Sequence, residues 1–432
     1  MKKGEYIFMN IKKIYQIGTK ENKAFMEKAR NELLSFGHGF VSPGGSAYYL
    51  GDDGTPWKDR ARETWITSRM AHVYCIGSFL DHPDSLKLAK AAIKGLCTEL
   101  HDEENGGWYA GLTANGEILP TKQCYAHAFV ILAASSGVLA GIRDAKLLLK
   151  DALEVYDQYF WNEDEGLSCD TWNTEFTKLD DYRGLNANMH TVEAFLAVAD
   201  VTGDEKYRIR AGRIIDHVLD WAKDNDWRIP EHFYKDWTPD LKCNKDHPDD
   251  PFKPYGATPG HGIEWSRLIL QWTLSTYKES TSAQAAPYIS AAQALYQRAI
   301  ADAWNVDGAP GMVYTTDWNG TPVVHDRMHW TLAEAINTSS VFWNITREEC
   351  YAKDYASFMQ YLDEVVWDHD TGSWFHQLDR KNHVIGTVWP GKSDLYHAVQ
   401  ATLIPFYSPK LSIAAAIKKS KGIVKIDYSD FQ

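Results

Sequence analysis

A short segment rich in Gly, Asp, Asn and aromatic residues recurs along the chain, and it constrains the fold more than any other feature. The copies are residues 102–109, 161–167, 304–320 and 367–374. Trp108 and Leu167 are 59 residues apart, and Met312 and Trp374 are 62 residues apart. The Asn-Gly steps in these segments are strong signals for hairpin turns. The recurrence predicts a repeated unit of roughly 60 residues, each unit ending in a small hairpin.

Between these segments, apolar residues recur at helical spacing, and no stretch alternates as a long strand would. We predict about twelve helices, at residues 22–36, 60–80, 83–100, 121–141, 143–160, 186–202, 204–224, 260–279, 283–303, 330–345, 347–364 and 392–406. A pair of helices cannot bury its apolar face alone, so six pairs are expected to close into a ring. The prediction is an all-α (α/α)6 barrel with short β-hairpins at one end. An open solenoid of helix pairs is the alternative.

The chain has 432 residues, and no low-complexity linker divides it. We therefore expect a single domain over residues 1–432, with residues 1–20 as a peripheral N-terminal extension. The sequence has no apolar run of membrane-spanning length and no signal-peptide pattern at its start, so a cytoplasmic protein is expected. The six cysteines are widely spaced and are expected to be reduced thiols.

Acidic residues outnumber basic residues by 58 to 45, which gives a formal charge of −13. This charge repels phosphate backbones and anionic lipid, so neither a nucleic acid nor a membrane is expected as a partner. Aromatic residues make up 13% of the chain, and 17 of them are Trp. Trp and Tyr combine an apolar face with a polar edge, which suits sugar-binding clefts as well as cores.

Sixteen histidines raise the question of a metal site, but no HxH, HExxH or CxxC pair occurs, so no metal is predicted. Glycine-rich nucleotide loops are also missing from the sequence, and no cofactor is expected. Three histidines, His190, His261 and His397, share one setting near the start of a predicted helix. A barrel gathers alternate helix starts around one opening, so these three are expected to converge. Histidines 72, 127 and 217 lack that setting and are assigned to structure.

The residues around these histidines suggest how the helices begin. Asn186 or Asn188 is expected to cap the helix of His190, and Ser393 or Asp394 that of His397. Thr258 is expected to cap the helix of His261, with proline next in the chain. For His190, a buried histidine with a purely structural role remains the alternative. For His261, the alternative is a capping box that joins Thr258 to a glutamate, which needs an offset of three residues, whereas Glu264 lies six residues away.

Two charged residues are candidates for chemistry. Glu264 lies three residues after His261, where its carboxylate would fix the tautomer of the imidazole and raise its basicity. Arg69 lies on an otherwise apolar helical face. A buried guanidinium must pair with a carboxylate or meet a hydroxyl-rich ligand, and both readings stay open.

At these residues the chain resembles the N-acylglucosamine 2-epimerase superfamily, and most closely its aldose–ketose isomerase branch, which includes mannose isomerases and sulfoquinovose isomerase. The resemblance covers residues from about 25 to 407. The segments that carry it are WITSRMAHVY (65–74), GGWYA (106–110), YRGLNANMHTVEAFL (182–196), PEHF (230–233), TPGHGIEW (258–265), VYTTDW (313–318) and WPGKSDLYH (389–397).

The resemblance implies that two histidines move a proton between C1 and C2 of an opened sugar through an enediol, without metal or redox cofactor. It places this general acid and base work on His261 and His397, with His190 as the third active-site histidine and Glu264 among the catalytic residues. Arg69 would stabilise charge on the enediolate. The matched positions that line the sugar cleft are Tyr125, Asn186, Glu264, Trp330 and Trp389.

Two further positions bear on which sugar is used. Where the sulfonate-sugar subgroup carries glutamines, this chain has His376 and Ser393. The expected activity is therefore the interconversion of D-mannose and D-fructose, or of D-lyxose and D-xylulose. The alternatives are a sulfoquinovose isomerase or a 2-epimerase acting on N-acylglucosamine or cellobiose. A glycoside hydrolase using acids such as Asp181, Glu231 and Asp317, or a non-catalytic binding module, is less favoured. The sequence predicts no oligomeric state.

Overall fold

The computed structural model describes residues 11–422, and this part of the chain contains thirteen α-helices. They are α1 Lys20–Phe36, α2 Thr64–Phe79, α3 Ser85–Cys97, α4 Cys124–Leu139, α5 Ala145–Tyr159, α6 Leu185–Thr202, α7 Glu205–Asp224, α8 Pro259–Tyr277, α9 Ala286–Ala303, α10 His329–Thr346, α11 Glu349–Tyr361, α12 Tyr396–Ala401 and α13 Ile413–Ser420. The first twelve overlap the twelve predicted helices.

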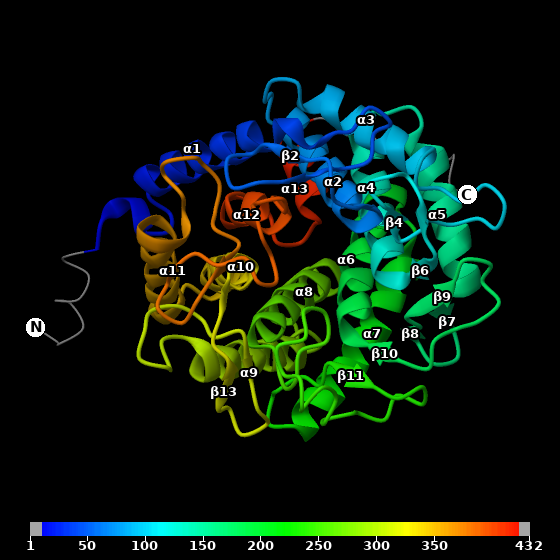
Figure 1. Cartoon of the computed structure of the whole chain (residues 1–432). Helices are drawn as coiled ribbons and strands as arrows, with labels where there is room; N and C mark the ends of the chain where they lie inside the picture. The colour runs from blue at the N-terminus through cyan, green and yellow to red at the C-terminus, as the bar shows by residue number, and fades with distance from the viewer. Residues whose placement is uncertain (1–10, 423–432) are drawn as a thin grey trace, which may run out of the picture.

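Alternate helices form a closed inner ring. Helices α2, α4, α6, α8, α10 and α12 contact one another in that order, and α12 returns to α2. Helices α3, α5, α7, α9 and α11 each pack outside the inner helix that precedes them, and α1 packs against α12 (Figure 1). The predicted (α/α)6 barrel is confirmed. The open solenoid is wrong, because the first and last inner helices are in contact.

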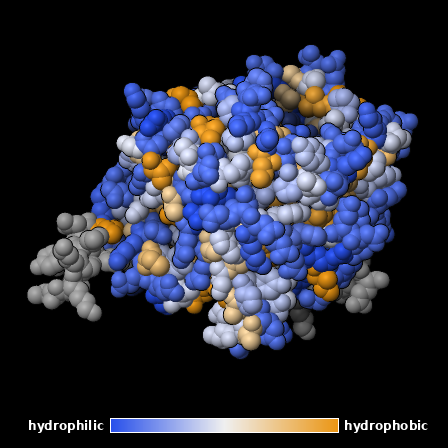
Figure 2. All heavy atoms as spheres, turned by 90° about the horizontal axis from the view of Figure 1, so that it is seen from below, coloured by the Kyte–Doolittle hydropathy of each residue, from blue (hydrophilic) through white to orange (hydrophobic). Residues whose placement is uncertain are grey.

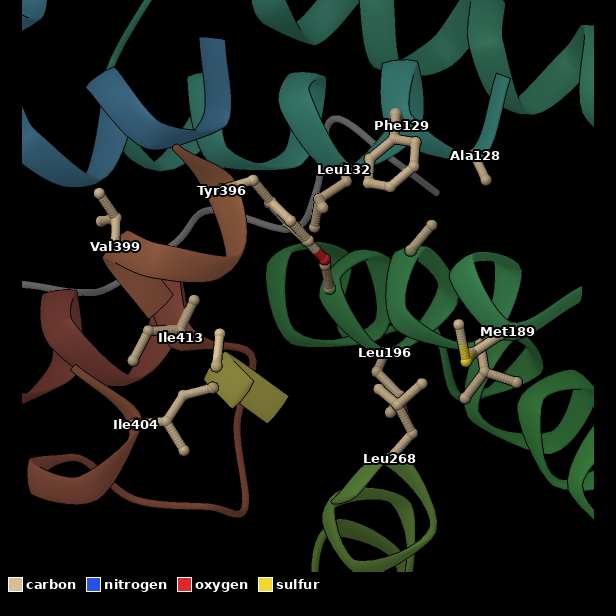
Figure 3. Packing of buried hydrophobic residues seen from close by; sticks show 14 of the residues in the cluster. Ala128, Phe129, Leu132, Met189, Leu196, Leu268, Tyr396, Val399, Ile404 and Ile413 are labelled. Carbon is tan, nitrogen blue, oxygen red and sulfur yellow. The ribbon is translucent and has the colours of Figure 1, made fainter. Parts of the chain in front are cut away.

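Burial follows this arrangement. In α2 and α4 almost every residue is buried, because an inner helix has neighbours on all sides. In α7 the buried residues recur every three or four positions along one face, as expected for an outer helix. Figure 3 shows side chains of α4, α6, α8 and α12 packed together, among them Phe129, Leu196, Leu268 and Tyr396. Each large apolar side chain buried here contributes roughly 1.5–3 kcal/mol to stability.

Fifteen short strands lie between the helices of residues 11–422. They are β1 Tyr49–Leu50, β2 Pro56–Trp57, β3 Arg62–Glu63, β4 Gly111–Leu112, β5 Ile118–Leu119, β6 Thr121–Gln123, β7 Trp161–Asn162, β8 Leu167–Ser168, β9 Thr171–Asn173, β10 Arg183–Gly184, β11 His232–Phe233, β12 Thr315–Thr316, β13 Pro322–Val324, β14 Arg327–Met328 and β15 Gln377–Leu378. All the pairings are antiparallel.

The strands gather at the end of the barrel where the inner helices begin. Strands β3, β6, β10 and β14 each end at the residue before α2, α4, α6 and α10, respectively. Hairpins β4–β5, β7–β8 and β12–β13 are local, whereas β6–β9, β10–β11 and β14–β15 join neighbouring repeats. The expected hairpins at one end are therefore present, and they surround the N-termini of the inner helices.

The sequence prediction was wrong at the last inner helix. Residues 392–406 were expected to form one helix, but α12 has only six residues and is followed by the 3-10 turn Ile404–Phe406. Pro405 explains this break, because its ring clashes with the carbonyl four residues earlier in an α-helix. Helix α13 was not predicted. It covers the opposite end of the barrel, where Asp200 at the end of α6 accepts a hydrogen bond from Ser412 N.

The described part of the expected N-terminal extension packs against the barrel. Tyr15 is 1% exposed, and its hydroxyl donates to Asp363 at 2.6 Å. One domain over residues 1–432 stays a prediction that the closed ring favours. All six cysteines are free thiols, as expected. None of the helices within residues 11–422 has the length and apolar character needed to cross a membrane. The face in Figure 2 is mostly hydrophilic, with its hydrophobic residues scattered.

Candidate active site

All six inner helices contribute candidate residues from their first two turns. Arg69 comes from α2, Tyr125 from α4, His190 from α6, His261 from α8 and His397 from α12. Trp330 is the second residue of α10. Because these turns meet at the hairpin end of the ring, the structure brings the candidate residues together at one opening.

Each of the three histidines lies against an aromatic ring of the site. The ring centroid of Trp330 lies 4.9 Å from that of His261 and 5.8 Å from that of His397. The ring of His190 lies 5.2 Å from that of Tyr125. His190 and His397 are 3% exposed, whereas the side chain of His261 is 13% exposed. His261 is therefore the one of the three that reaches furthest toward solvent.

Each of the three histidines holds a glutamate through Nδ1. His261 Nδ1 lies 3.0 Å from Glu231 Oε1, and His397 Nδ1 lies 3.0 Å from Glu334 Oε1. The corresponding distance from His190 to Glu193 is 3.3 Å. An ionised carboxylate only accepts hydrogen bonds, so each Nδ1 carries the proton and Nε2 is the nitrogen left for proton exchange.

These pairs correct one prediction. Glu264 was expected to hold His261, but the partner of His261 is Glu231, which lies 30 residues earlier in the chain. The Glu264 carboxylate instead lies 3.4 Å from Nη2 of Arg267, one turn further along α8. Glu231, Glu334 and Glu193 were not recognised as partners. The signal available for Glu334 is a carboxylate on an otherwise apolar helix, the same signal that singled out Arg69.

The Arg69 guanidinium is paired and also faces the site. Its Nη1 lies 2.5 Å from Asp394, and its Nη2 donates to the Tyr125 hydroxyl at 2.8 Å. The aromatic rings of Trp65, Tyr125, Phe129 and Tyr396 surround it at 4.3 to 5.7 Å. Burial raises the pKa of Asp394, but Arg69 and the neighbouring histidines together outweigh burial and hold that pKa far below its usual range. The pairing alternative for Arg69 is confirmed.

Several aromatic rings and the Asn186 amide line the same opening. Trp389 contacts Trp65 and the exposed Phe252, with centroids 6.1 and 5.9 Å away. Trp389 Nε1 and Asn186 Oδ1 are buried and have no hydrogen-bond partner within residues 11–422. A cavity of about 320 Å³ lies beside Tyr314, whose ring contacts Trp330. Its volume is in the range of small-ligand pockets.

His376 and Ser393 lie at the edge of this cluster with partners of their own. The His376 ring stacks on His329 at 4.0 Å with an interplanar angle of 6°. Burial lowers the pKa of His376 and that of His329, the latter to about 4. The Ser393 hydroxyl accepts from Leu50 N and donates to Leu50 O, which uses its single proton on the protein.

The helix starts differ in part from the expected caps. Thr258 is the N-cap of α8 and Pro259 its first residue, as predicted, although the Thr258 side chain makes no capping bond. The N-cap of α6 is Gly184, so Asn186 and Asn188 lie inside the helix. Asn188 instead bonds to the backbone of Ser168. The N-cap of α12 is Leu395, and Asp394 accepts from Tyr396 N.

The histidines assigned to structure have structural contacts. His72 bonds to Ser136, and burial lowers its pKa to about 4. His127 accepts from Trp108 N and bonds to Gln123 O. His217 bonds to Glu165 O.

Two overlapping groups have residue types that bind metals, with their ligand atoms within 4.8 Å of one another. They are His190 with Glu193 and Glu264, and Glu264 with Glu334 and His397. Arg267 already brings a positive charge to this place, because its Nε donates to Glu334 at 2.6 Å. These carboxylate and imidazole groups can therefore surround the Arg267 guanidinium as well as they could a metal ion.

Comparisons with known proteins identify the family. The family model for N-acylglucosamine 2-epimerase matches residues 44–401. A D-mannose isomerase from Pseudomonas cannabina pv. alisalensis is 40% identical over 356 residues, which cover 82% of this chain and 85% of that protein.

A second relative and a solved structure agree. A D-mannose isomerase from Thermobifida fusca is 37% identical over 400 residues, covering 92% of this chain and 97% of that protein. A crystal structure of D-mannose isomerase superimposes with a TM-score of 0.81 at 25% identity, covering 89% of this chain and 97% of that one. This chain belongs to the N-acylglucosamine 2-epimerase family.

Proposed function

We propose that the protein is an aldose–ketose isomerase that interconverts D-mannose and D-fructose. One observation carries the proposal. His261 and His397 both lie against the Trp330 ring, and each is bonded to a glutamate through Nδ1. The curated relatives at 40% and 37% identity are D-mannose isomerases, which supports mannose as the substrate.

The proposed reaction begins with opening of the sugar ring, assisted by His261, the most exposed of the three histidines. His397 Nε2 then takes the proton from C2 while O1 gains a proton, which gives a cis-enediol. Return of a proton to C1 and loss of the proton on O2 leave a ketone at C2. Arg69 stabilises the negative charge that develops on O1 and O2 during these steps.

The remaining site residues are proposed to hold the sugar. Tyr125, Trp330 and Trp389 offer ring faces, and the unpartnered Asn186 Oδ1 and Trp389 Nε1 offer an acceptor and a donor for hydroxyl groups. His376 would border the far end of the sugar. Ser393 would act through Leu50, to which its hydroxyl is bonded.

The acids considered for a hydrolase have other surroundings. Glu231 holds His261, and Asp317 accepts from Asn319 N and Thr321 N in a hairpin turn. Asp181 is exposed. Glycosidic cleavage needs two carboxyl groups facing the scissile bond, and none of these contacts favours that use.

Incubation with D-mannose in deuterated water, followed by NMR, tests the proposed function. We expect fructose with deuterium at C1, because the proton exchanges with solvent at the enediol. Glucose labelled at C2 would instead indicate an epimerase. Conversion of sulfoquinovose or cellobiose without conversion of mannose, or release of reducing ends from a disaccharide, would contradict the proposal.

Glu231→Gln tests the role of the His261 pair. The variant is expected to lower kcat on mannose about 10- to 100-fold, since a hydrogen bond to a charged group is worth roughly 1.5–3 kcal/mol. Steady-state kinetics at several pH values measure the loss. The matched control is Glu163→Gln, a surface glutamate paired with Arg210 and Arg213, which should retain activity. Equal losses in both variants would show that the Glu231 effect is not specific.

Activity is expected to survive EDTA, because Arg267 supplies positive charge between the carboxylates where a cation would otherwise bind. The measurement is the rate on mannose after dialysis against the chelator. Loss of activity that zinc or manganese restores would contradict this prediction.

A further inference from the structure

Three buried glutamates from three inner helices meet beside His190 and His397. Glu193 on α6, Glu264 on α8 and Glu334 on α10 are 6%, 1% and 0% exposed. A Glu264 oxygen lies within 4.8 Å of an oxygen of Glu193 and within 4.8 Å of an oxygen of Glu334. Carboxylates this close in a buried site strongly disfavour each other's ionisation.

The charges around Glu264 do not balance three ionised glutamates. The facing groups are Arg69 from α2, Tyr125 from α4, His190 from α6, Arg267 from α8, and Tyr396 and His397 from α12. Burial lowers the pKa of His190 to about 4, so its ring is neutral at pH 7. Arg69 is paired with Asp394. Among these facing groups of the described chain, Arg267 is thus the one guanidinium left for three carboxyl groups. It pairs with Glu334 and Glu264, and the cluster favours retention of a proton.

Hydrogen bonding identifies which carboxyl group retains it. Glu193 accepts from His190, from the Tyr396 hydroxyl and from Gln400 at 3.4 Å. Figure 3 shows the Tyr396 hydroxyl directed toward α6. These donors favour the charged form of Glu193.

Glu334 also accepts hydrogen bonds from three donors. It accepts from Arg267 at 2.6 Å, from His397 at 3.0 Å and from Asn337 at 3.3 Å. Glu264 has one long contact, at 3.4 Å from Arg267. It is the carboxyl group with the least support for a negative charge.

The directions of the pKa shifts agree with this ranking. Burial and the neighbouring Glu334 both raise the pKa of Glu264 well above its usual value. Burial also raises the pKa of Glu193 and Glu334, but their bonds to histidine and the charge of Arg267 outweigh it, and the pKa of each lies below its usual value.

We propose that Glu264 is a neutral carboxylic acid that holds one proton for the three-glutamate cluster and so keeps Glu193 and Glu334 ionised for His190 and His397. This is a positioning role, and it rests on the proposed function only for its catalytic consequence. It also replaces the role expected for Glu264 as the partner of His261.

Three matched substitutions, Glu264→Gln, Glu193→Gln and Glu334→Gln, test the proposal without substrate. An amide reproduces the donor and the acceptor of a neutral acid, but not a carboxylate. The pKa of Glu264 is raised in the folded state above the ordinary value of 4.5. The free energy of unfolding therefore falls as the pH rises above 4.5. At pH 7 we therefore expect Glu264→Gln to raise Tm, with the increase shrinking toward pH 4.5. The other two variants should lower Tm, because a lowered pKa contributes stability above the ordinary value.

Infrared difference spectra of wild type against Glu264→Gln give a second readout. The carbonyl band of a protonated carboxylic acid should be present in wild type at pH 7 and missing from Glu264→Gln. In kinetics on mannose, Glu334→Gln should lose more kcat than Glu264→Gln does. A Tm for Glu264→Gln below that of Glu334→Gln, or a wild type without the acid band, would overturn the proposal.

These readouts separate the two proposals. If mannose is not isomerised while the acid band and the Tm order are as expected, the proposed function fails and the neutral Glu264 stands. If mannose is isomerised but the acid band is missing, only the role of Glu264 fails.

Discussion

His397→Asn is expected to lower kcat on D-mannose by about 10²- to 10⁴-fold, the range contributed by general acid–base catalysis. Asparagine retains a donor that can reach Glu334, so the buried carboxylate keeps a partner. It cannot take a proton from C2, because an amide is not a base near neutral pH. The loss should therefore appear in kcat rather than in the folding of the barrel.

Two measurements make this result specific. Exchange of the C2 hydrogen of mannose with deuterated solvent should slow in parallel with kcat, since both need the same proton transfer. Thermal unfolding of His397→Asn should stay close to that of wild type. His383→Asn is the matched control, because the His383 side chain is 72% exposed and pairs with Asp379 on a hairpin. A His397→Asn enzyme within tenfold of wild type would remove His397 from the proton transfer.

The sequence predicted the barrel because its signal is repeated. The inner helices are mostly apolar and are buried on nearly all sides, as α2 and α4 show, and each hairpin segment marks the end of a unit. Helix α13 was missed because it belongs to no repeat. The last inner helix was predicted too long because Pro405 lies in an apolar stretch that resembles a helix by composition.

The candidate histidines were also found from sequence, but none of their three glutamate partners was. Glu231 lies 30 residues from His261, and Glu334 lies 63 residues from His397. Pairs of this kind are set by ring closure, which brings the start of one inner helix against the next repeat. Local spacing suggested Glu264 for His261, whereas the spacing of three residues does hold for His190 and Glu193.

Acidification should destabilise the barrel between pH 6.5 and about pH 4, because several histidines are buried in neutral form. Burial lowers the pKa of His72, His190 and His329 to about 4, and that of His127 to about 3. The unfolded chain titrates these groups near 6.5, so it takes up protons that the folded chain excludes. A lowered pKa gives stability above the unfolded value that is lost as the pH falls toward the folded value.

At pH 5 each of these four histidines is expected to reduce the free energy of unfolding by roughly 2 kcal/mol relative to pH 7, since one pKa unit corresponds to about 1.4 kcal/mol. Urea unfolding at pH 5, 6, 7 and 8 measures the effect. His72→Gln should remove the share of one histidine from the pH dependence of the free energy of unfolding, because glutamine does not titrate. His383→Gln, at an exposed position, should leave that dependence unchanged. A free energy of unfolding that is constant from pH 7 to pH 5 would mean that these rings take up protons in the folded state. It would also contradict the neutral state of His190 beside Glu193.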